Sequence, residues 1–378
     1  MKSIFKICLI AVMMTNLSAC KTDNSPAFKT QDAVSFVIEK VQQHDIIIFG
    51  EMHWVTEQID FFANIIPVLY ENGIRVFAFE ILYSGVQHWV DSLIYNDTYD
   101  TLLQNVILAQ FPMVLMTPYE NILYQLWKLQ QKIGLKNEKI KVLAIGPRPM
   151  TLEMYENYLN CLGYELTDLE MSFVDAYILP PQPEFVGACP DSVMAEIVLN
   201  HYRETEAKTV VFCGANHGIT RCYQYELFRD EMEPMVRMGN ILANELQEKV
   251  FSINILPILV LRRLGRTDFE MCFSRLNDYI EKHVLSGMIG FDLDASFFQN
   301  YDGELTVFPD FSTETCYDGA IFIKPRKELT VASFDNEWLI ERLPIGVKLF
   351  NLQMERTRQR HLEPSCECRK REKYLFIL

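Results

Sequence analysis

The chain is poor in positive charge and has no long hydrophobic stretch, and each shortage argues against a class of protein. Its 378 residues include 35 Lys and Arg against 50 Asp and Glu, which gives a formal net charge of −15. Nucleic acids bind basic patches, so this balance argues against a nucleic-acid partner. The longest apolar run beyond the N-terminus, residues 253–261, contains Pro257 and is far too short to span a bilayer.

Several familiar catalytic signatures are also missing. The sequence has no Gly-x-Ser-x-Gly nucleophile elbow, no His-Glu-x-x-His pair, no Walker loop and no dinucleotide-binding glycine fingerprint. It has ten cysteines but no Cys-x-x-Cys pair, and Cys366 and Cys368 have no histidine partners at the spacing of a zinc site. Buried thiols, or one or two disulfides, are the simpler interpretation of the cysteines.

The N-terminus has the order of parts that marks an exported lipoprotein. Lys2 and Lys6 supply positive charge, residues 7–14 form a short apolar segment, and Leu17-Ser18-Ala19-Cys20 resembles a bacterial lipobox. We therefore expect Cys20 to be the lipidated first residue of the mature protein. The sequence predicts a lipoprotein of the bacterial cell envelope that touches the membrane through its lipid only.

The rest of the chain alternates between short apolar runs and amphipathic segments, which is the pattern of βαβ units. We predict an α/β fold with a mainly parallel central sheet, flanking helices and a helical insertion over the carboxyl ends of the strands. The expected segments are a signal peptide (1–19), a lipidated tether with a leading helix (20–44), one α/β domain (45–350) and a charged C-terminal tail (351–378).

The stretch from residue 45 to residue 80 places polar side chains after two of the predicted strands. A strand at 46–49 is followed by Glu51 and His53, and a strand at 74–79 ends at Glu80. Ligands of open parallel sheets bind beyond the carboxyl ends of the strands, so these side chains are candidates for a site. Glu51 and His53 are two residues apart and should leave an extended loop on the same side.

Two later strands end in the same way. The strand predicted at 140–145 is followed by Arg148, which stands between two prolines that fix the backbone. The strand predicted at 209–213 is followed by Gly214-Ala215-Asn216-His217, so an apolar run and then Gly-x-x-His occurs twice in the chain. Two imidazoles and two carboxylates at one sheet edge would make a mixed nitrogen and oxygen site.

Two kinds of chemistry are open to this set of side chains. His53, Glu80 and His217 could ligate a divalent metal ion that activates water, with Glu51 beside them in the cofactor-binding set. Alternatively, a histidine could act as a base beside a glutamate, without a metal. The candidate catalytic residues are Glu51, His53, Glu80, His217 and Arg148. In either case the partner would be a small-molecule or peptide substrate.

These motifs resemble the superfamily that joins the Tiki and TraB proteins, the ChaN haem-uptake lipoproteins and the erythromycin esterases. The matching pieces are Gly50-Glu51-Met52-His53, Phe79-Glu80 and Gly214-Ala215-Asn216-His217. The closing segments Met238-Gly239-Asn240-Ile241-Leu242 and Tyr317 to Ile323 are similar too. Erythromycin esterases carry one more residue between glutamate and histidine, so the resemblance does not transfer a macrolide substrate.

The resemblance implies a hydrolytic site, as in Tiki-type proteins and erythromycin esterases, or haem binding, as in ChaN-type proteins. Together with the residue types it favours a metal-dependent hydrolase of ester or peptide bonds in the cell envelope. The alternatives are a haem-binding iron-uptake lipoprotein and a binding lipoprotein that has lost its chemistry. An axial haem ligand requires only one side chain, whereas two histidines and two glutamates are more than that requires.

The lipobox generates a prediction about the mature N-terminus. The mature protein should begin at an acylated Cys20 and partition into the membrane fraction, whereas Cys20→Ala should leave it unprocessed or unanchored. Mass spectrometry of the N-terminal peptide checks this. An intact or unacylated N-terminus would contradict it.

Overall fold

The computed structural model describes residues 29–53, 55–111, 117–134, 139–147, 189–221, 224–225, 234–256, 280–282, 287–293, 316–330 and 332. The predicted signal peptide, Cys20, Arg148 and the predicted tail 351–378 lie outside these residues. Of the helices that the structure describes, none combines the length and the apolarity needed to cross a membrane.

An open eight-stranded sheet forms the centre of the molecule, with the strand order β1-β9-β10-β8-β2-β5-β3-β4. The strands from β10 to β4 in this order are parallel, and β9 is antiparallel to both of its neighbours. In chain order the strands are β1 (Gln31–Asp32), β2 (Ile46–Glu51), β3 (Val76–Tyr83), β4 (Lys141–Gly146), β5 (Thr209–Gly214), β8 (Val250–Leu256), β9 (Ile289–Asp292) and β10 (Gly319–Phe322). A separate antiparallel pair joins β6 (Gln224–Tyr225) to β7 (Pro234–Met235). The prediction of a mainly parallel sheet is confirmed.

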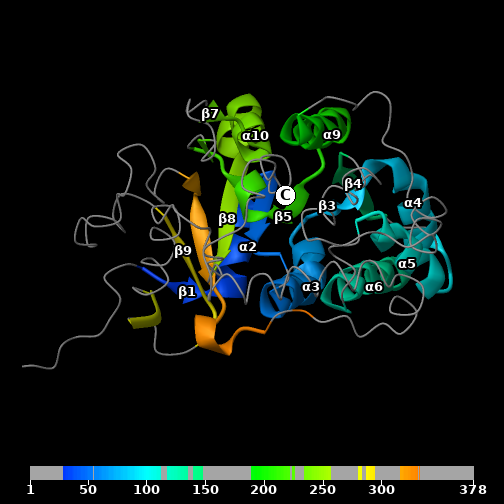
Figure 1. Cartoon of the computed structure of the whole chain (residues 1–378), viewed down its shortest axis with the longest axis horizontal. Coiled ribbons are helices and arrows are strands. Elements are labelled where there is room, and N and C mark those ends of the chain that lie inside the picture. Colours follow the sequence, from blue (N-terminus) through cyan, green and yellow to red (C-terminus); the bar gives the residue numbers. More distant parts are fainter. Residues whose placement is uncertain are drawn as a thin grey trace, which may run out of the picture.

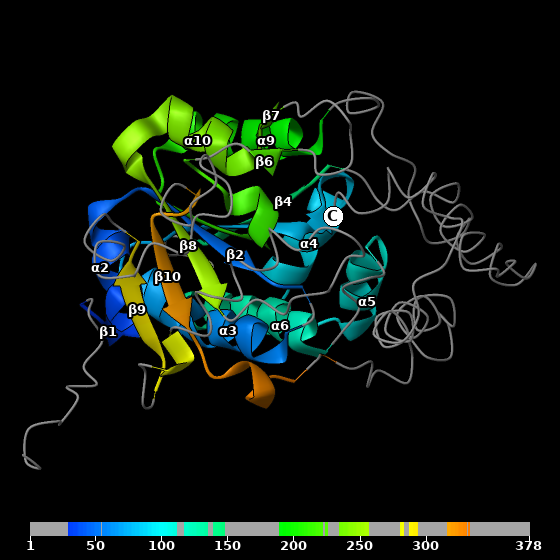
Figure 2. The same ribbon diagram turned by 60° about the vertical axis from the view of Figure 1, so that its left-hand side comes forward.

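Helices cover both faces of this sheet (Figures 1 and 2). The helices are α2 (Ala33–Gln43), α3 (Thr56–Glu71), α4 (Gln87–Tyr95), α5 (Thr101–Ala109), α6 (Thr117–Ile133), α9 (Pro190–Thr205) and α10 (Met238–Leu246). Short 3-10 turns are η1 (Ser84–Val86), η4 (Ala215–Gly218), η5 (Gln247–Lys249) and η6 (Arg326–Glu328). Helices α3 and α6 lie on one face, and α9 and α10 lie on the other (Figure 2). The helical insertion predicted after Glu80 is present as α4, α5 and α6.

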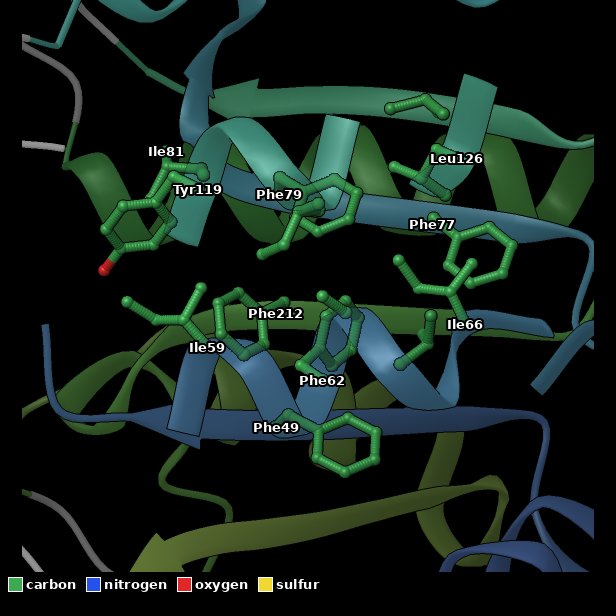
Figure 3. Close-up of a cluster of buried hydrophobic side chains, with 14 of the residues drawn as sticks. Phe49, Ile59, Phe62, Ile66, Phe77, Phe79, Ile81, Tyr119, Leu126 and Phe212 are labelled. Carbon is green, nitrogen blue, oxygen red and sulfur yellow. The ribbon is translucent and has the colours of Figure 1, made fainter. Parts of the chain in front are cut away.

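A row of phenylalanines sets the relative height of the three central strands. Phe49 of β2, Phe212 of β5 and Phe79 of β3 stand side by side in the parallel register. Phe62 of α3 lies over this row, with ring centroids 5.5 Å from Phe49, 5.8 Å from Phe79 and 4.3 Å from Phe212 (Figure 3). The polar residues that follow the row are therefore held at defined heights.

Two strands continue beyond their predicted ends: β2, predicted at 46–49, runs to Glu51, and β3 continues further still. The sequence predicts a strand at 74–79 that ends before Glu80, but β3 runs from Val76 to Tyr83 and includes Glu80. Residues 81–83 are buried, and Tyr83 pairs with Gly146 of β4 after a register irregularity between Phe79 and Tyr83, so the strand continues. Strand alternation then directs Glu80 to the face opposite Phe79, which is the face covered by α9 and α10.

Side chains of the helical insertion form hydrogen bonds with backbone groups at the outer edge of the sheet. β4 ends the strand order, and its exposed backbone groups would otherwise be open to pairing with another chain. The Gln87 side chain donates to the carbonyl of Val142 at 2.8 Å and accepts from the N–H of Ala144 at 2.8 Å. The Gln130 side chain accepts from the N–H of Ile140 at 3.1 Å. These bonds fasten α4 and α6 to the sheet.

The phenylalanine row generates a prediction about stability. Phe62→Ala should lower the free energy of unfolding by about 3–5 kcal/mol, because it removes a fully buried ring that contacts three strands. The exposed Leu102 is the matched control, since Leu102→Ala should change stability by less than about 0.5 kcal/mol. Urea unfolding of both variants measures the difference, and equal effects would show that the row does not organise the strands.

Candidate functional site

The predicted polar residues meet at the carboxyl ends of the three central strands. β5 lies between β2 and β3, so the loops after β2 and β5 are neighbours. Glu51 ends β2, His53 follows it, and His217 lies in η4, directly after β5. The prediction that Glu51, His53, Glu80 and His217 come together at one sheet edge agrees with this placement. Arg148 lies outside the described residues.

His217 is held between two buried carboxylates. Its Nδ1 is 2.7 Å from Asp191 Oδ1, and its Nε2 is 3.1 Å from Glu80 Oε1. Asp191 in turn accepts from Arg237 at 3.0 Å and from the backbone N–H of Met238 at 2.8 Å. We call the series Arg237, Asp191, His217 and Glu80 the His217 chain; each of its members is at most 6% exposed.

The His217 chain sets the charge of its own members. Burial lowers the pKa of His217, but the charges of Asp191 and Glu80 outweigh it and raise the pKa to about 10. Burial raises the pKa of Glu80, but attraction to His217 and the hydrogen bonds it accepts lower the pKa to about 2. The pKa of Asp191 is lowered for the corresponding reasons. At neutral pH His217 is therefore an imidazolium between two carboxylates.

His53 belongs to a second group of bonded side chains. Its Nδ1 lies 2.7 Å from Glu51 Oε1, and the hydroxyl of Tyr119 donates to the same oxygen at 2.7 Å. Burial lowers the pKa of His53, but the charge of Glu51 outweighs this, with help from Glu80, so the pKa is raised. Glu51 is 1% exposed, and Tyr119 is fully buried. The two groups approach the strand ends from opposite faces, since Glu51 follows the alternation of Phe49 and contacts α6.

Gly214 lets the two groups come close together. A Cβ at this position would stand 2.9 Å from Nε2 of His53 and 3.5 Å from Oε2 of Glu80. The backbone N–H of Gly214 also donates to Glu80 Oε2 at 2.6 Å. A side chain here would therefore displace the His53 ring. Glycine is therefore required at the first position of the second Gly-x-x-His motif, because any side chain there would clash with His53.

Three residues of this site were not predicted from the sequence. Asp191 stands in the first turn of α9, where an acidic residue usually serves the helix end. Arg237 precedes α10, and Tyr119 lies in the first turn of α6. No pattern in the sequence links these positions to the strand ends, because each contact joins segments far apart in the chain. An arginine or aspartate next to a predicted helix start was the only available signal.

The described residues do not form a metal site as they stand. Within the part of the chain that the structure describes, no group of three His, Cys, Asp or Glu side chains could hold a metal ion. Both ring nitrogens of His217 already face carboxylates, and both oxygens of Glu80 accept hydrogen bonds. The predicted ligands His53, Glu80 and His217 lie together, but a metal would require His217 and Glu80 to separate.

Three of the side chains that could ligate haem already make buried bonds. An axial ligand must present a nitrogen, oxygen or sulfur atom to iron. The ring nitrogens of His217 are bound to carboxylates, and the hydroxyl of Tyr119 bonds Glu51. The hydroxyl of Tyr317 likewise bonds the carbonyl of Ala215. These side chains would have to break buried bonds to reach a haem iron.

Comparison with known proteins identifies the fold. No protein-family model matches the sequence, and no curated protein matches it. Among solved structures, a mutant of the erythromycin esterase EreC in its open conformation aligns with a TM-score of 0.50 and 13% identity, over 80% of this chain and 94% of that chain. The chain shares the fold of erythromycin esterase. This agrees with the resemblance of the motifs, and at this identity it establishes the fold alone.

Two further structures align less well. A succinoglycan biosynthesis protein has a TM-score of 0.49 and 11% identity, over 79% of this chain and 91% of that chain. ChaN of Campylobacter jejuni, a haem-binding protein, has a TM-score of 0.36 and 14% identity, over 59% of this chain and 86% of that chain.

The charge on His217 generates a prediction about pH and stability. Its pKa is raised from 6.5 to about 10 by folding, so its stabilisation is complete below pH 6.5 and is lost as the pH rises toward 10. The free energy of unfolding should therefore fall by about 1.4 kcal/mol per pH unit across this window. Chemical denaturation of wild type and His217→Gln at pH 6.5, 8 and 9.5 measures it. His217→Gln should flatten the slope, whereas the exposed His88→Gln should keep it; parallel slopes for all three would contradict the assignment.

Proposed function

We propose that the chain is a hydrolase that cleaves an ester or peptide bond by acid–base chemistry at His53. The observation that carries the proposal is the arrangement of the two histidines: the His217 ring lies between the carboxylates of Asp191 and Glu80, and His53 lies at the same strand ends with Glu51 on Nδ1. The fold shared with erythromycin esterase supports a hydrolytic role.

In this proposal His53 is the general base. Glu51 holds the ring by Nδ1, so proton transfer takes place at Nε2, near Gly214 and Glu80. His53 takes a proton from a water molecule while the water oxygen bonds to the carbonyl carbon and the carbonyl π electrons move onto the carbonyl oxygen. The carbonyl then re-forms, the bond to the leaving oxygen or nitrogen breaks, and His53 gives its proton to that leaving atom. The positive charge formed on the ring is stabilised by Glu51 and Glu80, and these two carboxylates outweigh burial and the opposing charge of His217, so the pKa of His53 is raised.

The His217 chain has a supporting role. A neutral or absent His217 would remove the cation paired with the buried Glu80 carboxylate and leave Asp191 paired with Arg237 alone, which is costly. His217 and the Gly214 N–H together fix the orientation of Glu80 beside His53. The metal-dependent hydrolase expected from the sequence would instead need Glu80 and His217 to open around an ion. Removal of divalent metal by a chelator should abolish hydrolysis by the metal-dependent mechanism and leave hydrolysis by the His53 mechanism intact.

The proposal also covers the subcellular location of the protein. The lipobox at Leu17 to Cys20 supports a membrane-anchored lipoprotein of the bacterial cell envelope. A disulfide at Cys316 supports an oxidising compartment, where such bonds persist. The substrate would accordingly be a small molecule or peptide that reaches the envelope.

The test is hydrolysis of an ester and peptide panel by the purified mature protein, before and after dialysis against EDTA. Activity should survive chelation and fall by about 10²–10⁴-fold in His53→Gln, with folding retained. Glu80→Gln and His217→Gln should fall to a similar level, because the residues act as a unit. His88→Gln is the matched control and should keep full activity, since His88 is exposed on α4.

Other outcomes would assign other functions. Activity that disappears on chelation and returns with added divalent metal would favour the metal-dependent hydrolase. A stoichiometric haem complex that survives all three site substitutions, without hydrolysis, would favour the iron-uptake alternative. If the protein shows neither hydrolysis nor haem binding, the result would favour the inactive binding lipoprotein.

A further inference from the structure

Tyr119 connects the helical insertion to the base of the proposed reaction. It is fully buried in the first turn of α6, and its hydroxyl lies at the edge of the phenylalanine-rich core, beyond Ile59 and Ile81 (Figure 3). The hydroxyl donates to Glu51 Oε1 at 2.7 Å. The same oxygen lies 2.7 Å from Nδ1 of His53. One carboxylate oxygen thus receives two donors from two different parts of the fold.

This sharing fixes how the Glu51 carboxylate is turned. Its other oxygen, Oε2, is buried and has no hydrogen-bond partner among the residues that the structure describes. A buried carboxylate oxygen needs a donor, which an ordered water or a ligand can supply. With Tyr119 and His53 both on Oε1, Oε2 remains available for such a donor. Loss of the Tyr119 hydroxyl would let the carboxylate rotate and share its oxygens differently.

Helix α6, which carries Tyr119, is held in place by packing and by a hydrogen bond. Leu126 and Leu129 of α6 belong to the core that covers the phenylalanine row. Gln130, near the other end of α6, is fully buried, and its side chain accepts from the backbone N–H of Ile140, the residue before β4. The helix is therefore fixed to the sheet at one end and to Glu51 at the other. A contact from such an element can hold a side chain in one orientation.

We propose that Tyr119 is a positioning residue of this site: through Glu51 it holds His53 in the tautomer with hydrogen on Nδ1, and it leaves Glu51 Oε2 to bind a donor from water or substrate. This inference rests on the proposed function for its catalytic consequence, but the Tyr119–Glu51–His53 contact itself does not. The helical insertion then contributes a side chain to the site.

Nitrogen-15 NMR of the histidine rings tests the contact without any substrate. His53 signals are assigned by their loss in His53→Gln. In wild type, the Nδ1-bound proton of His53 should give a low-field, exchange-protected resonance. In Tyr119→Phe this resonance should move further downfield, because Glu51 Oε1 loses its competing donor and bonds His53 more strongly. Tyr124→Phe, on the same helix and 40% exposed, is the matched control and should leave it unchanged.

A double-mutant comparison covers the case in which Tyr119→Phe merely disturbs packing. If Tyr119 acts through Glu51, adding Tyr119→Phe to Glu51→Gln should produce little further change in the His53 signals. If Tyr119→Phe acts only by disturbing packing, it should change the His53 signals by the same amount in wild type and in Glu51→Gln. Unchanged His53 signals in Tyr119→Phe, or full additivity with Glu51→Gln, would overturn the proposal.

The kinetic arm applies to a substrate found in the ester and peptide panel. Tyr119→Phe should lower kcat by about 10-fold with KM nearly unchanged, since positioning acts on the base rather than on substrate binding. Tyr124→Phe should leave both constants unchanged. If wild type hydrolyses nothing, the proposed function fails, and the NMR comparison still decides the role of Tyr119. An unchanged kcat in Tyr119→Phe would overturn its catalytic consequence.

Discussion

The structure of the site depends on one interaction, the burial of His217 between Asp191 and Glu80. Two carboxylates in a dry interior would be strongly unfavourable if they stood alone, and a histidine that carries a proton removes most of that cost. Arg237 compensates the remaining charge on Asp191 at 3.0 Å. Charge balance therefore ties together residues from β3, η4, α9 and the start of α10.

The sheet supplies the geometry that this charge balance requires. The phenylalanine row levels β2, β5 and β3, and Phe62 covers all three strands from one side. Strand alternation then sends Glu51 toward α6 and Glu80 toward α9 and α10. His53 lies where the two groups approach each other, over a glycine that leaves room for its ring. Helices on both faces of the sheet thus contribute side chains to a single site.

Much of this could be predicted from the sequence, for identifiable physical reasons. Apolar runs between helical patterns predicted the parallel sheet, and polar residues after those runs predicted Glu51, His53 and His217 at its edge. Glu80 was predicted at the right edge but outside its strand, because pairing with β4 beyond Phe79 has no local signal. Asp191, Arg237 and Tyr119 could not be predicted, since their roles depend on contacts between distant segments. The same contacts decide how His217 and Glu80 are bonded, which the types of the residues alone left open between a metal ligand and an acid–base group.

The most direct test of this account is the charge of His217 in metal-free protein at pH 8. Nitrogen-15 NMR of labelled histidine distinguishes a ring with two protonated nitrogens from a neutral ring, and the His217 signals are assigned by their loss in His217→Gln. The account predicts that both nitrogens of His217 carry protons at this pH, because its pKa is raised to about 10. A neutral ring with one unprotonated nitrogen would contradict it.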